Sequence, residues 1–90
     1  MQESTTVLGL AAAAFTSLAY IPQVRKALPP GATGDLSLST LSVLITGLGL
    51  WVIYGIATAD PIIWFANSLG VGLVGTVLAC KLRDISQNGN

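Results

Sequence analysis

Three long intervals of this chain contain no charged residue, and this pattern restricts the fold more than any other feature. The intervals are 4–24, 36–59 and 61–80. Each is close to the roughly 20 residues with which a helix crosses about 30 Å of hydrocarbon. Charged residues make up only 9% of the chain, against about 25% in soluble domains, so three buried apolar helices would lack a polar cover. We therefore predict an all-α membrane protein.

The predicted spans are residues 6–26, 38–57 and 61–81, and together they form one domain over residues 1–90. With three spans, the N-terminus and the second connection lie on one side, whereas the first connection and the C-terminus lie on the other. All four basic residues fall in the second pair of segments: Arg25, Lys26, Lys81 and Arg83. The positive-inside rule then predicts a multi-pass protein of the cell (inner) membrane, with its N-terminus outside and its C-terminus in the cytoplasm.

Asn67 is a strongly polar side chain well inside the third interval. An amide that faced lipid there would lose its water partners, at a cost of roughly 2–7 kcal/mol if it stayed unbonded. We therefore expect Asn67 to face protein or a wet cavity. In the second interval Gly47, Trp51 and Tyr54 share one helical face, which suits either a ligand or a neighbouring helix.

The ends of the spans carry capping signals. Ser37 or Ser39 can accept hydrogen bonds from the free N–H groups at the start of the second span. Asp60 is the expected N-cap of the third span, with Pro61 at the first helical position, where its missing N–H costs nothing.

Pro22 interrupts the last part of the first span. Its ring removes the backbone bond to the carbonyl of Leu18 and crowds that carbonyl. Transmembrane helices tolerate such a break where a neighbouring group satisfies the carbonyl, and Gln23 is the obvious local partner. Two interpretations stay open on the sequence alone, a hinge and a simple proline at the end of the helix.

Three motifs in order resemble a known family. The segment Tyr-Ile-Pro-Gln at 20–23 is similar to the Pro-Gln hallmark of PQ-loop proteins. It is followed by Trp-x2-Tyr-Gly at 51–55 and Pro-x5-Asn at 61–67, and the whole resembles the SemiSWEETs, bacterial half-size sugar transporters. The resemblance implies a parallel homodimer of three-helix bundles in spatial order 1-3-2. One sugar would bind at mid-membrane on the twofold axis.

The resemblance also implies roles for individual residues. Trp51 and Asn67 would bind the sugar, since rings cover its apolar faces and amides bond its hydroxyls. Pro22 with Gln23 would be the hinge, and Tyr54 and Asp60 would belong to the outer gate. We add as a hypothesis a pocket wall made of Phe15, Leu18 and Gly47.

The expected function is sugar transport by alternating access, with glucose and sucrose both candidate substrates. No Asp, Glu, His, Lys or Arg lies inside the three charge-free intervals, which favours uniport over a proton relay. The residues indicate no catalytic group, cofactor, metal site or nucleic-acid partner, so we do not expect an enzyme. Two alternatives are a small structural or pore-forming membrane protein, in which Asn67 joins helices, and a PQ-loop carrier of a non-sugar solute.

Overall fold

The computed structural model describes residues 3–88, and over this range it contains three α-helices and no strand. Helix α1 covers Glu3–Ala27, α2 covers Leu38–Ala57 and α3 covers Pro61–Asn88. Each helix is long and apolar enough to cross a membrane. Helix α1 begins three residues before the expected span at 6–26, and α3 continues seven residues beyond residue 81.

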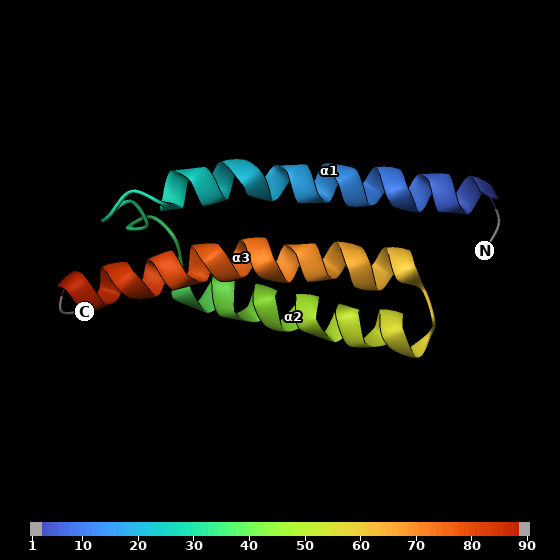
Figure 1. Ribbon diagram of the computed structural model, residues 1–90. Coiled ribbons are helices and arrows are strands. Elements are labelled where there is room, and N and C mark those ends of the chain that lie inside the picture. Colours follow the sequence, from blue (N-terminus) through green and yellow to red (C-terminus); the bar gives the residue numbers. More distant parts are fainter. Residues whose placement is uncertain (1–2, 89–90) are drawn as a thin grey trace.

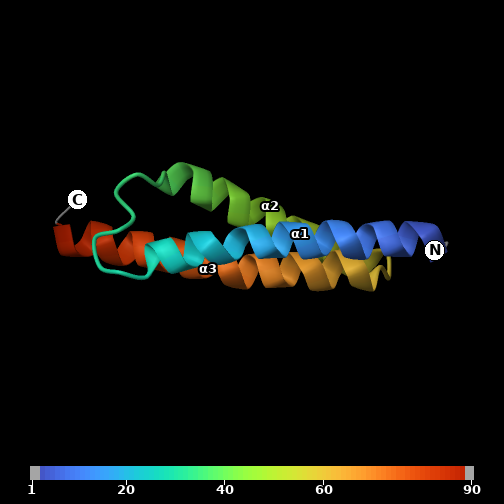
Figure 2. The ribbon, with the colours of Figure 1, turned by 90° about the horizontal axis from the view of Figure 1, so that it is seen from above.

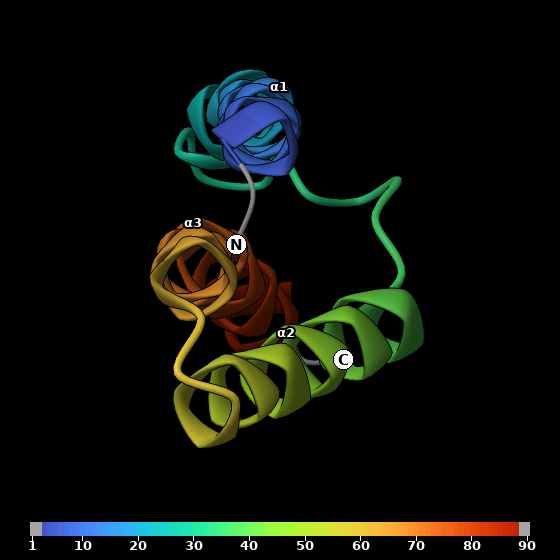
Figure 3. The ribbon, with the colours of Figure 1, turned by 90° about the vertical axis from the view of Figure 1, so that its right-hand side faces the viewer.

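Helix α3 lies between the other two helices (Figures 1 and 3). It packs against both α1 and α2, whereas α1 and α2 do not pack against each other within the described residues. This is the spatial order 1-3-2. The N-terminal end of α1 and the 58–60 turn share one end of the bundle, and the 28–37 connection shares the other end with the C-terminal part of α3 (Figure 1). We call the latter the basic end, because it carries Arg25, Lys26, Lys81 and Arg83.

The three helices form a single bent layer. The principal extents of the bundle are 51, 23 and 14 Å, and the smallest is not much more than the roughly 10–12 Å diameter of one helix. The view turned by 90° shows α1 and α3 overlapping along most of their length, with α2 inclined to them (Figure 2). One protomer therefore cannot surround a solute.

The buried core is small and lies mainly on the contact between α3 and α2. Val74 and Val77 of α3 are each only 2% exposed, and they belong to one cluster with Leu41 and Leu48 of α2. The cluster extends to Ala27 at the end of α1 and to Cys80, a free thiol that is buried. Large apolar side chains elsewhere on the bundle are exposed, as expected where lipid rather than water surrounds a helix.

Hydrogen bonds at the helix starts confirm the expected caps. The hydroxyl of Ser37 accepts from the Thr40 backbone N–H at 3.1 Å, so Ser37 rather than Ser39 caps α2. Oδ1 of Asp60 accepts from the N–H groups of Ile62 and Ile63 at 3.2 and 3.3 Å. These bonds satisfy donors that have no partner within the first turn of a helix.

The 58–60 turn closes α2 with a Schellman arrangement. The N–H of Ala59 donates to the Ile56 carbonyl at 3.1 Å, and the N–H of Asp60 donates to the Gly55 carbonyl at 2.8 Å. Ala59 adopts φ of 54°, the left-handed position that this motif gives mostly to glycine. The turn therefore brings α2 and α3 very close together near Gly55.

Pro22 lies inside α1, which continues for five more residues to Ala27. The end-of-helix interpretation is therefore wrong. Gln23 forms no side-chain hydrogen bond with any described residue, so it does not satisfy the Leu18 carbonyl as we expected. Its side chain is exposed instead.

Candidate functional site

Asn67 lies half-buried in a cleft between α1 and α3. Its side-chain Nδ2 donates to the backbone carbonyl of Ile63, one turn earlier in the same helix, at 2.8 Å. The cleft has a volume of about 220 Å³ and also takes in Leu48 of α2. The α1 wall of the cleft consists of small and hydroxyl-bearing residues: Gly9, Ala12, Ala13, Thr16, Ser17 and Tyr20.

Trp51 and Tyr54 lie on a face of α2 that the protomer leaves open. Their rings meet edge to face, with centroids 5.5 Å apart and planes at 87°. With Gly47 and Leu50 they line a shallow groove of about 490 Å³. Trp51 and Tyr54 are each 53% exposed, so a large part of this aromatic surface is available to another molecule.

The structure brings Gly47, Trp51 and Tyr54 together but places Asn67 in a separate cleft of the same protomer. Leu48 connects the Asn67 cleft with the aromatic groove. It lines the cleft and precedes Trp51 by three residues on α2. Because residues three apart in a helix are neighbours on its surface, the aromatic face begins where the cleft ends.

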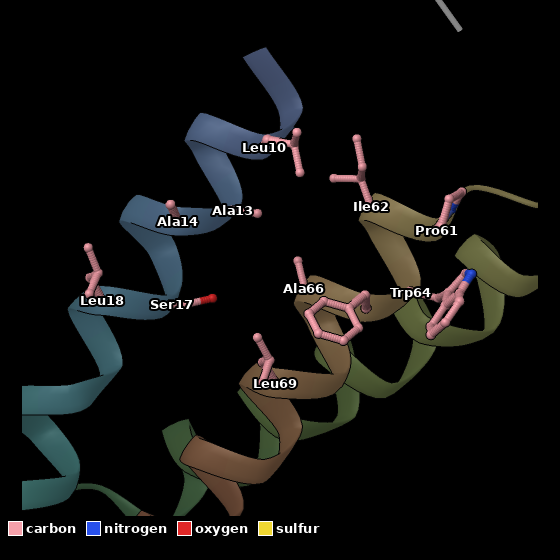
Figure 4. Close-up of a pocket in the computed structure, with 11 residues that line it drawn as sticks. Leu10, Ala13, Ala14, Ser17, Leu18, Pro61, Ile62, Trp64, Ala66 and Leu69 are labelled. Atoms are coloured by element: carbon pink, nitrogen blue, oxygen red, sulfur yellow. The ribbon is translucent and has the colours of Figure 1, made fainter. Parts of the chain in front are cut away.

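Phe15 and Leu18 do not lie in the Asn67 cleft. Phe15 is 78% exposed. Leu18 lines a groove of about 610 Å³ on the other side of the α1–α3 contact (Figure 4). Ala13 and Ser17 contribute to both hollows, so this pair marks the line that separates them.

The groove in Figure 4 is almost entirely apolar, and the polar side-chain groups among the residues that line it are the Ser17 hydroxyl and the Trp64 indole N–H. Pro61 and Trp64 lie at the end of the groove near the 58–60 turn (Figure 4). Trp64 is 38% exposed there. Such a surface suits lipid chains, with the indole placed near the end of its helix as in an interfacial belt.

Tyr54 and Asp60, the expected gate residues, both lie near the bundle end opposite the basic end. Oδ1 of Asp60 is occupied by the α3 cap. Within residues 3–88, no group of three or more His, Cys, Asp or Glu side chains is placed to hold a metal ion.

The basic end contains an ordered polar cluster that sequence reasoning missed. The Asp84 carboxylate is 4% exposed and accepts from the Gly31 N–H at 2.9 Å, the Thr33 N–H at 3.1 Å and the Thr33 hydroxyl at 2.5 Å. Arg83 donates to three backbone carbonyls, those of Ala27, Leu28 and Pro29. The hydrogen-bonded residues of α3 and of the 27–33 segment are more than 50 positions apart in the sequence. No local motif could therefore predict the cluster.

A more exposed pair lies beside this cluster. Lys26 donates to the Asp35 carboxylate, and this hydrogen bond is the largest cause that lowers the pKa of Asp35 below its ordinary value. Because both side chains are more than half exposed, water screens the pair, and its effect on stability is small.

Comparison with known proteins places these features in a family. Residues 5–64 match the PQ loop repeat. The chain is 39% identical to the sugar transporter SemiSWEET of Bradyrhizobium diazoefficiens over 77 residues, which is 86% of this chain and 90% of that protein.

Two further relatives agree with that match. The sugar transporter SemiSWEET of Leptospira biflexa is 31% identical over 90% of this chain and 95% of its own length. The corresponding figures for the protein of the same name in Escherichia coli are 31%, 89% and 90%. No solved structure matches the chain. The chain belongs to the PQ-loop family and, within it, to the SemiSWEETs.

Proposed function

We propose that this protein is a sugar uniporter of the cell (inner) membrane that works as a parallel homodimer. The observation that carries the proposal is the open aromatic face of α2, where Trp51 and Tyr54 are each more than half exposed beside the Asn67 cleft. The three relatives described above are named sugar transporters. An aromatic face next to an amide suits a sugar, which has apolar faces and a rim of hydroxyls.

The single-layer shape of the protomer supports the dimer. Because three helices in one layer enclose nothing, a second copy is needed to close a path. A twofold axis along the membrane normal would bring both copies of Trp51 and Asn67 toward one central site. The residues of α2 left open by the protomer, from Gly47 to Tyr54, would then face the partner.

Alternating access would use the position in α1 where Pro22 removes a backbone hydrogen bond. Movement there would open one side while the gate near Tyr54 and Asp60 closes the other. The apolar intervals contain no Asp, Glu or His that could relay a proton, which supports transport down a sugar gradient. The positive-inside rule orients the basic end toward the cytoplasm and the N-terminus outside.

The alternative that Asn67 holds helices together by hydrogen bonds receives little support from its contacts. Its Nδ2 bonds to a carbonyl of its own helix rather than to α1 or α2. Asn67→Ala should therefore leave the fold of the protomer intact. It should remove the amide that a sugar hydroxyl would use.

The test is counterflow of labelled glucose and labelled sucrose in liposomes containing the purified protein. Trp51→Ala and Asn67→Ala should abolish saturable exchange while cross-linking still detects the dimer. Trp64→Ala is the matched control, because Trp64 lines the apolar groove on the other side of α1 and α3. It should exchange sugar like the wild type.

Two results would contradict the proposal. Absence of exchange of either sugar by a correctly assembled wild-type dimer would favour a different solute. Loss of the dimer in Asn67→Ala would instead favour the structural role of this amide.

A further inference from the structure

Three hydroxyl side chains within α2 and α3 form hydrogen bonds to backbone carbonyls of their own helix. The side chains of Thr46, Ser68 and Thr76 each donate to the carbonyl four residues earlier, at 2.8, 2.6 and 2.8 Å. In the membrane interior, where water is absent, such a bond stabilises the hydroxyl. A buried hydroxyl without any hydrogen bond costs about 1–3 kcal/mol.

Two hydroxyls on one face of α1 lack such a bond. The side chains of Thr16 and Tyr20 form no hydrogen bond with any described residue, although both lie within a predicted membrane span. They are four residues apart, so they share one face of the helix. Both line the cleft that holds Asn67.

Ser17 also lacks a partner among the described residues, but it borders both the cleft and the lipid-side groove. Thr16 and Tyr20 line only the cleft. The Tyr20 ring is half-buried in the centre of the bundle, where its Cε2 would lie 3.4 Å from a Cβ added to Gly70. The position of this ring is therefore fixed by packing.

The chemistry of the cleft follows from these contacts. One N–H of the Asn67 Nδ2 donates to the Ile63 carbonyl, so the amide still offers its carbonyl oxygen as an acceptor and its second N–H as a donor. The hydroxyls of Thr16 and Tyr20 can each donate and accept. A cleft with three such groups in apolar walls fits a solute that itself carries several hydroxyls.

We infer that Thr16 and Tyr20 are specificity-determining residues that hydrogen-bond the hydroxyls of the transported sugar. They form the α1 side of the site whose α3 side is Asn67. The inference rests on the proposed function, and it adds a second wall to the sugar site, opposite Asn67.

The experiment compares half-saturation concentrations in glucose counterflow for Thr16→Val and Tyr20→Phe, which remove a hydroxyl and nearly preserve shape. One uncharged hydrogen bond corresponds to a rise of about three- to tenfold. Thr16→Ser keeps the hydroxyl and should restore the wild-type value. Thr76→Val is the control, since that hydroxyl is bonded to Gly72 on its own helix.

Monodeoxyglucose analogues then locate the bond. For the analogue that lacks the contacted hydroxyl, the half-saturation concentration of the wild type should rise to about the value that the variant shows for glucose. The variant itself should have the same half-saturation concentration for glucose and for this analogue. A merely structural role for Thr16 or Tyr20 would weaken all analogues equally.

The outcomes separate the inference from the function on which it rests. If the wild type exchanges glucose and both variants keep its half-saturation concentration, the inference is overturned and the proposed function stands. If the wild type exchanges neither glucose nor sucrose, both fall. If the wild type discriminates among the analogues and Thr16→Val or Tyr20→Phe does not, the result supports both the inference and the proposed function.

Discussion

Helices α2 and α3 come into backbone contact at Gly55, and this contact predicts the effect of one added methyl group. A Cβ at Gly55 would lie 2.6 Å from the backbone N of Trp64, 3.0 Å from its Cα and 2.9 Å from Cγ2 of Ile63. Two of these atoms are backbone, so rotation of a side chain cannot relieve the overlap. The substitution Gly55→Ala must therefore push α2 away from α3.

The 58–60 turn makes that displacement expensive. The Gly55 carbonyl accepts from the N–H of Asp60 at 2.8 Å, so separating the helices strains or breaks this bond, worth about 1 kcal/mol. Overpacking costs about 1–3 kcal/mol, whereas alanine in place of a helical glycine gains about 0.5–1 kcal/mol. We expect Gly55→Ala to lower the free energy of unfolding by about 1–3 kcal/mol.

The measurement is denaturant unfolding in detergent micelles, followed by circular dichroism. Gly72→Ala is the matched control in the interior of α3, because a Cβ there has no neighbour within 4 Å. It should be neutral or stabilising by up to about 1 kcal/mol. A Gly55→Ala protein as stable as the wild type would refute the close backbone contact, and equal losses in both variants would refute its local origin.

Two further predictions concern the helix ends and use the same assay. Ala59→Gly should stabilise the protein by up to about 1 kcal/mol, since glycine relieves the left-handed φ of 54°; a loss of stability would contradict that strain. Ser37→Ala should destabilise α2 by about 0.5–2 kcal/mol because the Thr40 N–H loses its cap, whereas Ser39→Ala should have no such effect.

The presence of the three helices followed from simple physics, whereas their order did not. Charge-free intervals of about 20 residues leave few choices other than spanning helices, and the resemblance supplied the order 1-3-2. The caps at Ser37 and Asp60 were also predictable, because their hydrogen bonds are local and depend on one side chain each.

The rotation of α1 about its own axis was not predictable. Most of α1 is apolar on every side, so its sequence does not indicate which face meets α3. Packing decides this, for example where Ile62 lies against Gly9. As a result Phe15 and Leu18 lie away from the Asn67 cleft, and Thr16 and Tyr20 line it.

The basic end provides the last prediction, because its cluster ties the part of α1 beyond Pro22 to α3. Helix α1 ends at Ala27, where the last carbonyls of a helix lack intrahelical partners. The Arg83 guanidinium donates to the carbonyl of Ala27 at 3.1 Å and to that of Leu28 at 2.8 Å. One Arg can serve several carbonyls at once because its donors are held in a planar fork.

Hydrogen exchange at the Gly31 and Thr33 amides tests this tie, since both donate to Asp84. Asp84→Asn keeps the size of the side chain but removes its charge, so these amides should exchange about tenfold faster. The control Asp35→Asn breaks only an exposed ion pair and should leave both amides unchanged. Equal exchange in wild type and Asp84→Asn would show that the connection is not held by α3. If these hydrogen bonds fix residues 23–27 relative to α3, a bend at Pro22 must move the part of α1 that precedes Pro22.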